Sequence, residues 1–261
     1  IWKILLIVFS IVLIICLIII GIQKYQQKKQ QEYYEALLEN AGSQPQATEE
    51  VPEPETEEAP DVLKSLGIEI PEKDIDFTAL KEENSDVYAW IYVPGTNVDY
   101  PVLQHPTDDA YYLEHNMDGS KGLPGCIYTE SVNTKDFTDP NTVLYGHNMK
   151  NGSMFGSLKQ YKNDGFYEKN AYFTVFTEDA AYRYQIFAYS DVPEDSDVYT
   201  TGYLPDETFD GFLTELLKSS YKDTGVAVGK DDKVLTLSTC SGDGLRFVVH
   251  AVRVDEHESG M

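Results

Sequence analysis

The chain has 261 residues, and its 44 acidic and 20 basic side chains give a formal net charge of −24 at pH 7. This charge argues against a nucleic-acid partner, because phosphate binding requires clustered lysine and arginine. A chain of this length can bury a core without a metal or a disulfide, and three cysteines are too few for a disulfide scaffold. The 19 tyrosines favour a β-rich domain over a helical bundle.

The N-terminal segment has the composition of a membrane-spanning helix. Residues 4–22 carry no charge and are mainly Ile, Leu and Val. As a helix they would span about 28 Å, close to the thickness of the hydrocarbon core of a bilayer. A cleavable signal peptide would have a shorter apolar run and a small-residue cleavage site. We therefore predict residues 1–22 to be an uncleaved transmembrane signal anchor, with a buried helix of a soluble protein as the alternative.

A polar segment follows this span. Residues 23–40 are rich in Gln, Lys and Glu and are compatible with a helix that continues out of the membrane. Residues 41–60 combine Glu and Pro with no basic residue, so they cannot bury enough apolar surface to offset the entropy of the chain. We predict residues 23–60 to be a juxtamembrane helix and a disordered acidic linker that holds a domain away from the membrane.

Residues 61–261 are predicted to form one mainly β domain. One or two short helices are expected at 61–86, divided by Pro71. A longer helix is expected at 206–221, with Asp206 as its N-cap and Gly225 after its end. Strands are predicted at 89–93, 98–103, 125–129, 142–145, 171–176, 182–189, 234–238 and 246–254, where several segments alternate apolar and polar residues. About eight short strands with one inserted helix predict a small barrel or sandwich.

Cys240 is the first candidate for chemistry. It ends the apolar run 234–240 and precedes a glycine-rich loop, where a substrate backbone can approach closely. The alternative is an inert buried cysteine, because this residue type is among the most buried. Arg246 starts the next predicted strand, so a hairpin could return its guanidinium to the sulfur, where a cation favours the thiolate and offers donors to an oxyanion.

His147 is the second candidate, because it lies in a Tyr-Gly-His-Asn turn directly after a predicted strand. Such a turn displays a side chain from a rigid edge, and an imidazole can act as a general acid or base near neutral pH. The other histidines, His105, His115, His250 and His257, are expected to be structural or solvated.

These segments together resemble the sortases, the cysteine transpeptidases of Gram-positive bacterial surfaces. The motifs are Thr-Leu-Ser-Thr-Cys ending at Cys240, the following Arg246, and Tyr-Gly-His-Asn around His147. More closely, the chain resembles a class B sortase over residues 73–254, because of its N-terminal helical flank and the helix before the cysteine strand. The supporting runs are 90–102, 111–113 and 152–155. One departure is that Cys240 and Arg246 are closer in sequence than in some class B members.

The resemblance implies a fold and a set of roles. The fold is an eight-stranded β-barrel with N-terminal helices and an inserted helix, in which the cysteine and arginine strands adjoin and the histidine lies opposite. Cys240 would be the nucleophile that cleaves a sorting signal after Thr through a thioester. His147 would protonate the leaving amine, and Arg246 would bind the oxyanion and the substrate. An amine of the cell wall or of a pilin would then take the acyl group.

The resemblance also suggests substrate-binding residues and partners. Asn97 and Ser238 are expected to touch the sorting peptide, and the backbone of Thr239 to help hold the oxyanion. The expected partners are surface proteins with a C-terminal sorting signal of the Asn-Pro-x-Thr or Pro-x-Thr-Gly kind, and a peptidoglycan precursor or pilin amine as acceptor. No metal or cofactor is expected, and Cys126 and Cys240 are expected to be free thiols.

The charge distribution around the span and the chemistry give different orientations. Three lysines follow the span and only Lys3 precedes it, so a literal positive-inside count places the domain in the cytoplasm. We expect further residues to precede Ile1, which makes this count incomplete. Exchange of one amide for another needs no ATP and therefore works outside the cell. We predict a single-pass protein of the cell membrane with an extracellular catalytic domain.

Three alternatives to a sortase can be compared with the sequence. A papain-like peptidase places its cysteine before its histidine, whereas here His147 precedes Cys240. An L,D-transpeptidase has a Ser-His-Gly-Cys run that this sequence lacks. A membrane-tethered extracellular β-domain that binds a surface ligand without catalysis, with Cys240 merely buried, remains the alternative function.

Overall fold

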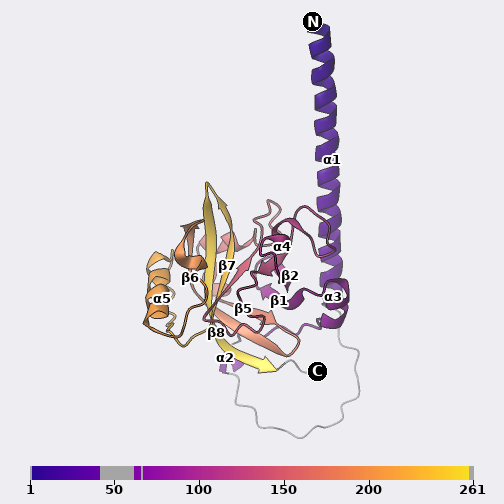
Figure 1. The fold of residues 1–261 in the computed structure, drawn as a ribbon. Coiled ribbons are helices and arrows are strands. Elements are labelled where there is room, and N and C mark those ends of the chain that lie inside the picture. The colour runs from indigo at the N-terminus through magenta and orange to yellow at the C-terminus, as the bar shows by residue number, and fades with distance from the viewer. Residues whose placement is uncertain (1, 42–61, 66, 259–261) are drawn as a thin grey trace, which may run out of the picture.

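The computed structural model describes residues 2–41, 62–65 and 67–258 of the chain (Figure 1). The predicted acidic linker lies outside these residues, apart from its first position, which ends the N-terminal helix.

Eight strands and a small number of helices form the described part of the chain. The helices are α1 (Trp2–Ala41), α2 (Val62–Ser65), α3 (Phe77–Glu83), α4 (Tyr111–Glu114) and α5 (Glu207–Ser219), with short 3₁₀ helices η1 (Leu158–Lys162), η2 (Tyr167–Lys169) and η3 (Asp197–Tyr199). The strands are β1 (Val87–Val93), β2 (Val98–Leu103), β3 (Ile127–Thr129), β4 (Asn141–Tyr145), β5 (Tyr172–Phe176), β6 (Ala180–Pro193), β7 (Val234–Gly242) and β8 (Leu245–Glu258).

The strands close into one barrel in the order β1-β2-β3-β4-β7-β8-β6-β5. The predicted eight-stranded barrel is therefore confirmed, and the sandwich alternative is wrong. Side chains that point inward, such as Ile91, Leu144, Leu237 and Val249, are completely buried. The strands β6, β7 and β8 extend beyond their predicted bounds because they pair with one another in long antiparallel ladders. Closure leaves no free sheet edge in the barrel. The side chains that a ligand can approach are therefore expected at the ends of the strands.

The inserted helix α5 forms where the spacing of its apolar residues predicts it. Its N-cap is Asp206, whose carboxylate accepts from the backbone N–H of Thr208 at 2.8 Å. Phe209 and Leu213 are buried in a cluster with residues of β6, β7 and β8. The helix therefore covers the outside of the barrel and stabilises the strands that carry the cysteine and the arginine (Figure 1).

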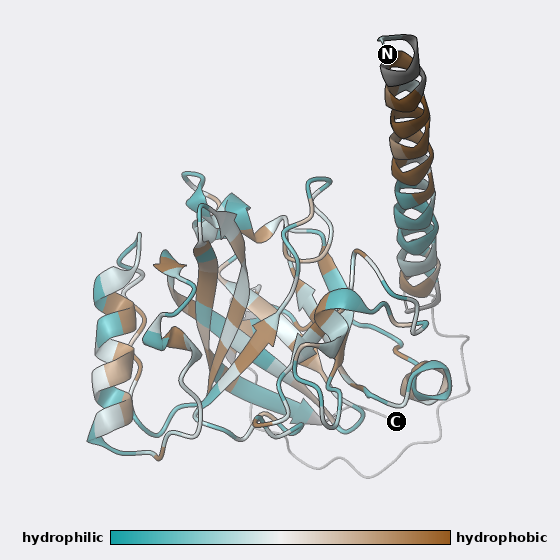
Figure 2. Cartoon of the chain, turned by 45° about the horizontal axis from the view of Figure 1, so that its top comes forward, coloured by the Kyte–Doolittle hydropathy of each residue, from teal (hydrophilic) through white to brown (hydrophobic). Residues whose placement is uncertain are grey.

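The N-terminal helix α1 has two different halves. Its N-terminal half is apolar and exposed, and its C-terminal half is polar (Figure 2). By length and composition, α1 is the one helix among the described residues that could cross a membrane. The C-terminal half packs directly on the barrel, where Gln30 and Tyr34 are only 5% and 6% exposed. The sequence did not predict this packing, and it means that the barrel contacts the helix before the linker begins.

One end of the barrel, called the mouth below, carries the tip of the β7–β8 hairpin and faces the same side of the molecule as the apolar half of α1 (Figure 1). In Figure 1 the tip of the β7–β8 hairpin points the same way as the N-terminal end of α1. A bilayer around the apolar half would therefore lie on the side of the molecule to which this hairpin points.

Candidate active site

The pairing of three adjacent strands brings the three candidate side chains to one end of the barrel. In the parallel pair of β4 and β7, Tyr145 stands opposite Ser238. Two residues further along are His147, which lies just beyond the end of β4, and Cys240, which is still within β7, so the two residues stand at the same level. In the antiparallel pair of β7 and β8, Cys240 is the partner of Arg246. The cysteine strand thus lies between the arginine strand and the histidine strand.

Cys240 is an exposed free thiol at the end of β7. Cys126, in contrast, is buried beside β3, and burial raises the pKa of its thiol to about 12. The two cysteines are unpaired, as predicted. The alternative of a buried Cys240 is therefore wrong, because this residue is exposed.

His147 is held in a socket made of backbone. Its Nε2 lies 2.7 Å from the carbonyl oxygen of Leu113 at α4. Because a carbonyl only accepts, Nε2 carries a hydrogen, and Nδ1 is the nitrogen that can gain or lose a proton. Gly125 lies beside the imidazole, because a Cβ placed on it would lie 3.4 Å from Cδ2 of the ring, and its positive φ and close approach to the carbonyl of Tyr112 require glycine there.

Asn148 connects the histidine turn to the cysteine strand. Its side-chain amide donates to the carbonyl oxygen of Cys240 at 2.7 Å. This contact holds the end of β4 against the end of β7 beyond the last pair of the ladder. The sequence contained one signal for it, a polar residue directly after His147, but nothing in the pattern distinguished it from ordinary turn chemistry.

Arg246 is returned to the cysteine by a tight hairpin. Asp243 has a positive φ of 51° between Gly242 and Gly244, so it belongs to the turn itself. The guanidinium of Arg246 donates to the carboxylate of Glu194 at 3.1 Å. Both side chains are partly exposed, so this ion pair adds little stability and serves mainly to orient the guanidinium. Sequence reasoning missed Glu194, because it lies in the connection after β6, far from either motif.

A wall of tyrosine rings stands next to Cys240. Tyr128 stacks on Tyr145 with ring centroids 5.4 Å apart, and Tyr145 stacks on Tyr199 at 6.0 Å. The hydroxyl of Tyr199 contacts that of Ser238, two residues before Cys240 on β7, so the wall stands beside the cysteine strand. These rings give the site an apolar side, which the sequence did not predict.

The proposed peptide-contacting residues have different environments. Ser238 is buried, and its hydroxyl lies 2.9 Å from that of Tyr199. Thr239 is buried as well, whereas Asn97 is exposed on the turn between β1 and β2. The side chain of Asn97 donates to the carbonyl of Gly152, so it faces the loop after His147 rather than the thiol.

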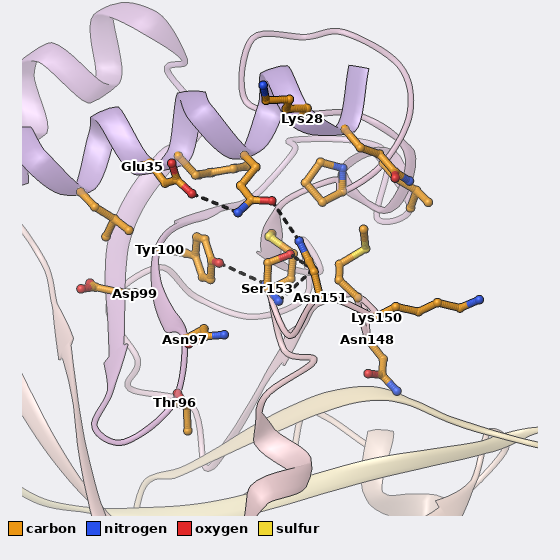
Figure 3. Close-up of a pocket in the computed structure, with 18 of the residues that line it drawn as sticks. Lys28, Glu35, Thr96, Asn97, Asp99, Tyr100, Asn148, Lys150, Asn151 and Ser153 are labelled. Carbon is orange, nitrogen blue, oxygen red and sulfur yellow. Dashed lines mark hydrogen bonds between the residues drawn. The ribbon is translucent and has the colours of Figure 1, made fainter. Parts of the chain in front are cut away.

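Two hollows meet at Asn148. The smaller, of about 500 Å³, contains Cys240 and Thr239 together with Lys162. The larger, of about 1090 Å³, lies between α1 and the loop 148–154 and includes Asn97 (Figure 3). Asn148 lines both, and in Figure 3 its side chain points toward the β7–β8 strands.

The closed mixed barrel and the row of histidine, cysteine and arginine at its mouth define a sortase-like class of protein. The sortase domain matches residues 91–254, which is more than half of the chain. The chain therefore belongs to the sortase family.

Its relatives place it among the class B sortases. Sortase B of Listeria monocytogenes is 35% identical over 161 residues, which are 62% of this chain and 65% of that protein. The structure of Clostridium perfringens sortase B superposes with a TM-score of 0.63 and 34% identity, covering 68% of this chain and 99% of that one. A Staphylococcus aureus sortase B–substrate complex superposes with a TM-score of 0.64 and 30% identity, covering 69% and 84%. The match thus spans about two thirds of the Listeria relative.

Proposed function

We propose that the chain is a cysteine transpeptidase that joins proteins carrying a sorting signal to an amine. The observation that supports this most directly is the register of three adjacent strands, by which Cys240 on β7, Arg246 on β8 and His147 just after β4 come to one end of the barrel. A thiol for nucleophilic attack, an imidazole for proton transfer and a permanent cation are the groups that acyl transfer requires. Membership of the sortase family supports the same assignment.

In the first half of the proposed reaction, the thiolate of Cys240 attacks the backbone carbonyl carbon of the threonine in the sorting signal. The electron pair of the carbonyl moves to oxygen, and the guanidinium of Arg246 faces the resulting oxyanion. As the tetrahedral intermediate collapses, the imidazolium of His147 gives a proton to the departing amine. The products are a thioester on the sulfur and a free amine on the released peptide.

In the second half, an acceptor amine attacks the thioester and loses a proton to the neutral imidazole of His147. The thiolate leaves, and one amide bond has been formed for the one that was broken. The Nε2–H of His147 stays bonded to Leu113, so Nδ1 is the atom that carries this proton in both halves. The arrangement therefore needs one proton carrier and no external energy source.

The donor peptide is proposed to lie along the tyrosine wall and β7. Ser238 and Thr239 lie under this path, and the hydroxyl of Tyr199 already bonds to Ser238. Asn97 is proposed to contact the peptide from the larger hollow. This hollow shares Asn148 as a lining residue with the smaller hollow that contains the thiol.

The apolar half of α1 is proposed to anchor the protein in the cell membrane with the catalytic domain outside. Since the β7–β8 hairpin and the apolar half of α1 point the same way, the mouth would face the bilayer surface (Figure 1). Surface proteins held at the membrane and a peptidoglycan precursor or a pilin would meet the thiol there.

A peptide library tests the proposal. The full chain in detergent is incubated with peptides that contain Asn-Pro-x-Thr and Pro-x-Thr-Gly variants, with and without an added amine, and the products are identified by mass spectrometry. Cleavage after Thr, with transfer to the amine when it is present, is the expected result. Cys240→Ala should abolish both. Binding of peptides without cleavage by the folded wild type would favour a ligand-binding domain instead.

A further inference from the structure

The C-terminal half of α1 contacts the barrel at the back of the histidine socket. The hydroxyl of Tyr34 donates to the carbonyl oxygen of Gly125 at 3.0 Å, in a buried environment. Burial also raises the pKa of Tyr34, so the hydroxyl keeps its proton and remains a donor. The ring is fixed by an edge-on contact with Tyr100, with centroids 5.3 Å apart. Tyr34 therefore holds one backbone atom of Gly125 in place.

Gly125 in turn shapes the pocket of the imidazole. Its α-carbon lies so close to α4 that an added Cβ would approach the carbonyl oxygen of Tyr112 to 2.7 Å and that of Leu113 to 3.1 Å. The same Cβ would approach Cδ2 of His147 to 3.4 Å. Gly125 therefore neighbours both the imidazole ring and the Leu113 carbonyl that accepts from Nε2, so its position helps to define the space that the ring occupies.

A neighbouring residue of α1 strengthens the same attachment. The side chain of Gln30 is buried and donates to Asp118 at 3.1 Å and to Ser120 at 3.2 Å. Both acceptors belong to the loop between α4 and β3, which also contains Gly125. This loop is therefore held by α1 at two places.

A second arm of α1 reaches the loop after the histidine. Asn151 donates from its side chain to Gln31 at 3.2 Å, and Gln31 donates to Glu35 at 3.0 Å (Figure 3). In the same loop the backbone N–H of Met154 donates to the hydroxyl of Tyr100 at 3.2 Å. This is the loop that begins with Asn148, the residue bonded to the carbonyl of Cys240. The helix thus touches the supports of the histidine and of the cysteine strand.

We propose that the juxtamembrane part of α1 is a structural component of the active site, in which Tyr34 is a positioning residue for His147 acting through Gly125. Gln31 is proposed to be a positioning residue for Asn148, because it accepts from Asn151 in the same loop. In this proposal the helix that anchors the protein also has a role in catalysis, because its C-terminal half fixes the position of the His147 imidazole. This inference rests on the proposed function for its kinetic consequence, but its structural part can be tested alone.

The test compares Tyr34→Phe with Tyr25→Phe in the full chain in detergent or in lipid nanodiscs. Both variants lose only a hydroxyl from the same helix, but Tyr25 is 71% exposed and serves as the matched control. Histidine side chains are labelled with ¹⁵N, and the ring signals of His147 are assigned with a His147→Gln variant. Hydrolysis of the peptide that the library identifies gives kcat and KM.

For Tyr34→Phe we expect the ring nitrogen signals of His147 to shift or broaden and kcat to fall about tenfold at similar KM, because small displacements of a catalytic group have large kinetic effects. Tyr25→Phe should match the wild type in every respect. Unchanged His147 signals in a folded Tyr34→Phe protein would overturn the proposal. So would a loss of activity that only follows a loss of folded protein.

A second pair of variants keeps the inference testable if Tyr34→Phe does not fold. Gln31→Ala removes the bond to Asn151 from an exposed position, and Gln27→Ala, one turn earlier and also exposed, is its control. A lower kcat for Gln31→Ala alone supports the second arm, and equal kcat for the two variants contradicts it. If the wild type shows no transpeptidation at all, the proposed function fails while the His147 signals still decide whether α1 positions the ring.

Discussion

The chemistry proposed for this protein uses Cys240, whose environment is the opposite of that of Cys126. Cys240 is exposed near the end of β7, where it is the cross-strand partner of Arg246. Cys126 lies under α1, where the hydroxyl of Tyr34 is 3.7 Å from its sulfur and burial raises the pKa of its thiol. A thiol must be accessible and must ionise to act as a nucleophile, and burial of Cys126 opposes both, whereas Cys240 is exposed.

Thiol labelling should separate the two at the residue scale. A short incubation of the full chain with iodoacetamide at pH 7.5 should modify Cys240 at least tenfold faster than Cys126, as measured by peptide mapping. Cys126→Ser should leave the labelling of Cys240 unchanged. Equal rates at the two sites in folded protein would show that the environments described here do not control reactivity.

Residue type and position in the sequence single out His147, Cys240 and Arg246, which the strand pairing brings to one end of the barrel, while their catalytic roles stay a prediction. His147, Cys240 and Arg246 each stand at a strand end, where a side chain leaves the sheet, and each has a side chain with few structural uses there. Asn148 and Glu194 were not found, because amides and carboxylates are common in turns and the contacts of these two depend on the register of distant strands. The backbone carbonyl of Leu113 has no signature in sequence at all.

At the scale of elements, α5 shows how local signals set a boundary. The helix begins where Asp206 accepts from two backbone N–H groups, of Thr208 and Phe209. Its apolar face was readable from its spacing, as was the alternation of most strands. The packing of α1 on the barrel was not readable, because a few tyrosines and leucines in a segment rich in Gln and Lys give no clear apolar face.

Removing the cap of α5 should have a modest and specific effect. Asp206→Ala leaves two N–H groups without their acceptor and should cost about 1 kcal/mol, which lowers Tm by a few degrees in a domain of this size. Thermal unfolding followed by circular dichroism in detergent measures this. Asp206→Asn keeps an acceptor and should stay near the wild type. Equal losses in both variants would mean that the charge, and not the cap, matters.

At the scale of the whole molecule, a buried histidine makes the stability of the barrel depend on pH. His250 on β8 bonds through Nδ1 to Thr236 on β7, and burial lowers its pKa to about 3. The unfolded chain, where histidine titrates near pH 6.5, therefore binds a proton more readily than the folded barrel between these two values. The contribution is complete above about pH 6.5 and is lost as the pH falls toward 3.

The difference between pH 7.5 and pH 5 should be about 2 kcal/mol of unfolding free energy from this group alone. Denaturant unfolding of the wild type and of His250→Gln at the two pH values measures it. The variant should lose less stability on acidification than the wild type, whatever its stability at pH 7.5. His105→Gln, at a half-buried position, should keep the wild-type pH dependence. Parallel pH profiles for wild type and His250→Gln would contradict the burial of a neutral imidazole.

The central claim is that acyl transfer passes through a thioester on Cys240, and intact-mass spectrometry tests it most directly. The full chain is mixed with the intact donor peptide that the library identifies, without an amine. The reaction is quenched in acid after short times, and the mass of the protein is measured. We expect an added mass equal to the acyl fragment, located on Cys240, which disappears as the amide product forms when an amine is supplied. The thioester mechanism would be contradicted if Cys240→Ala cleaved the peptide at the wild-type rate and the wild type showed no covalent adduct at any time.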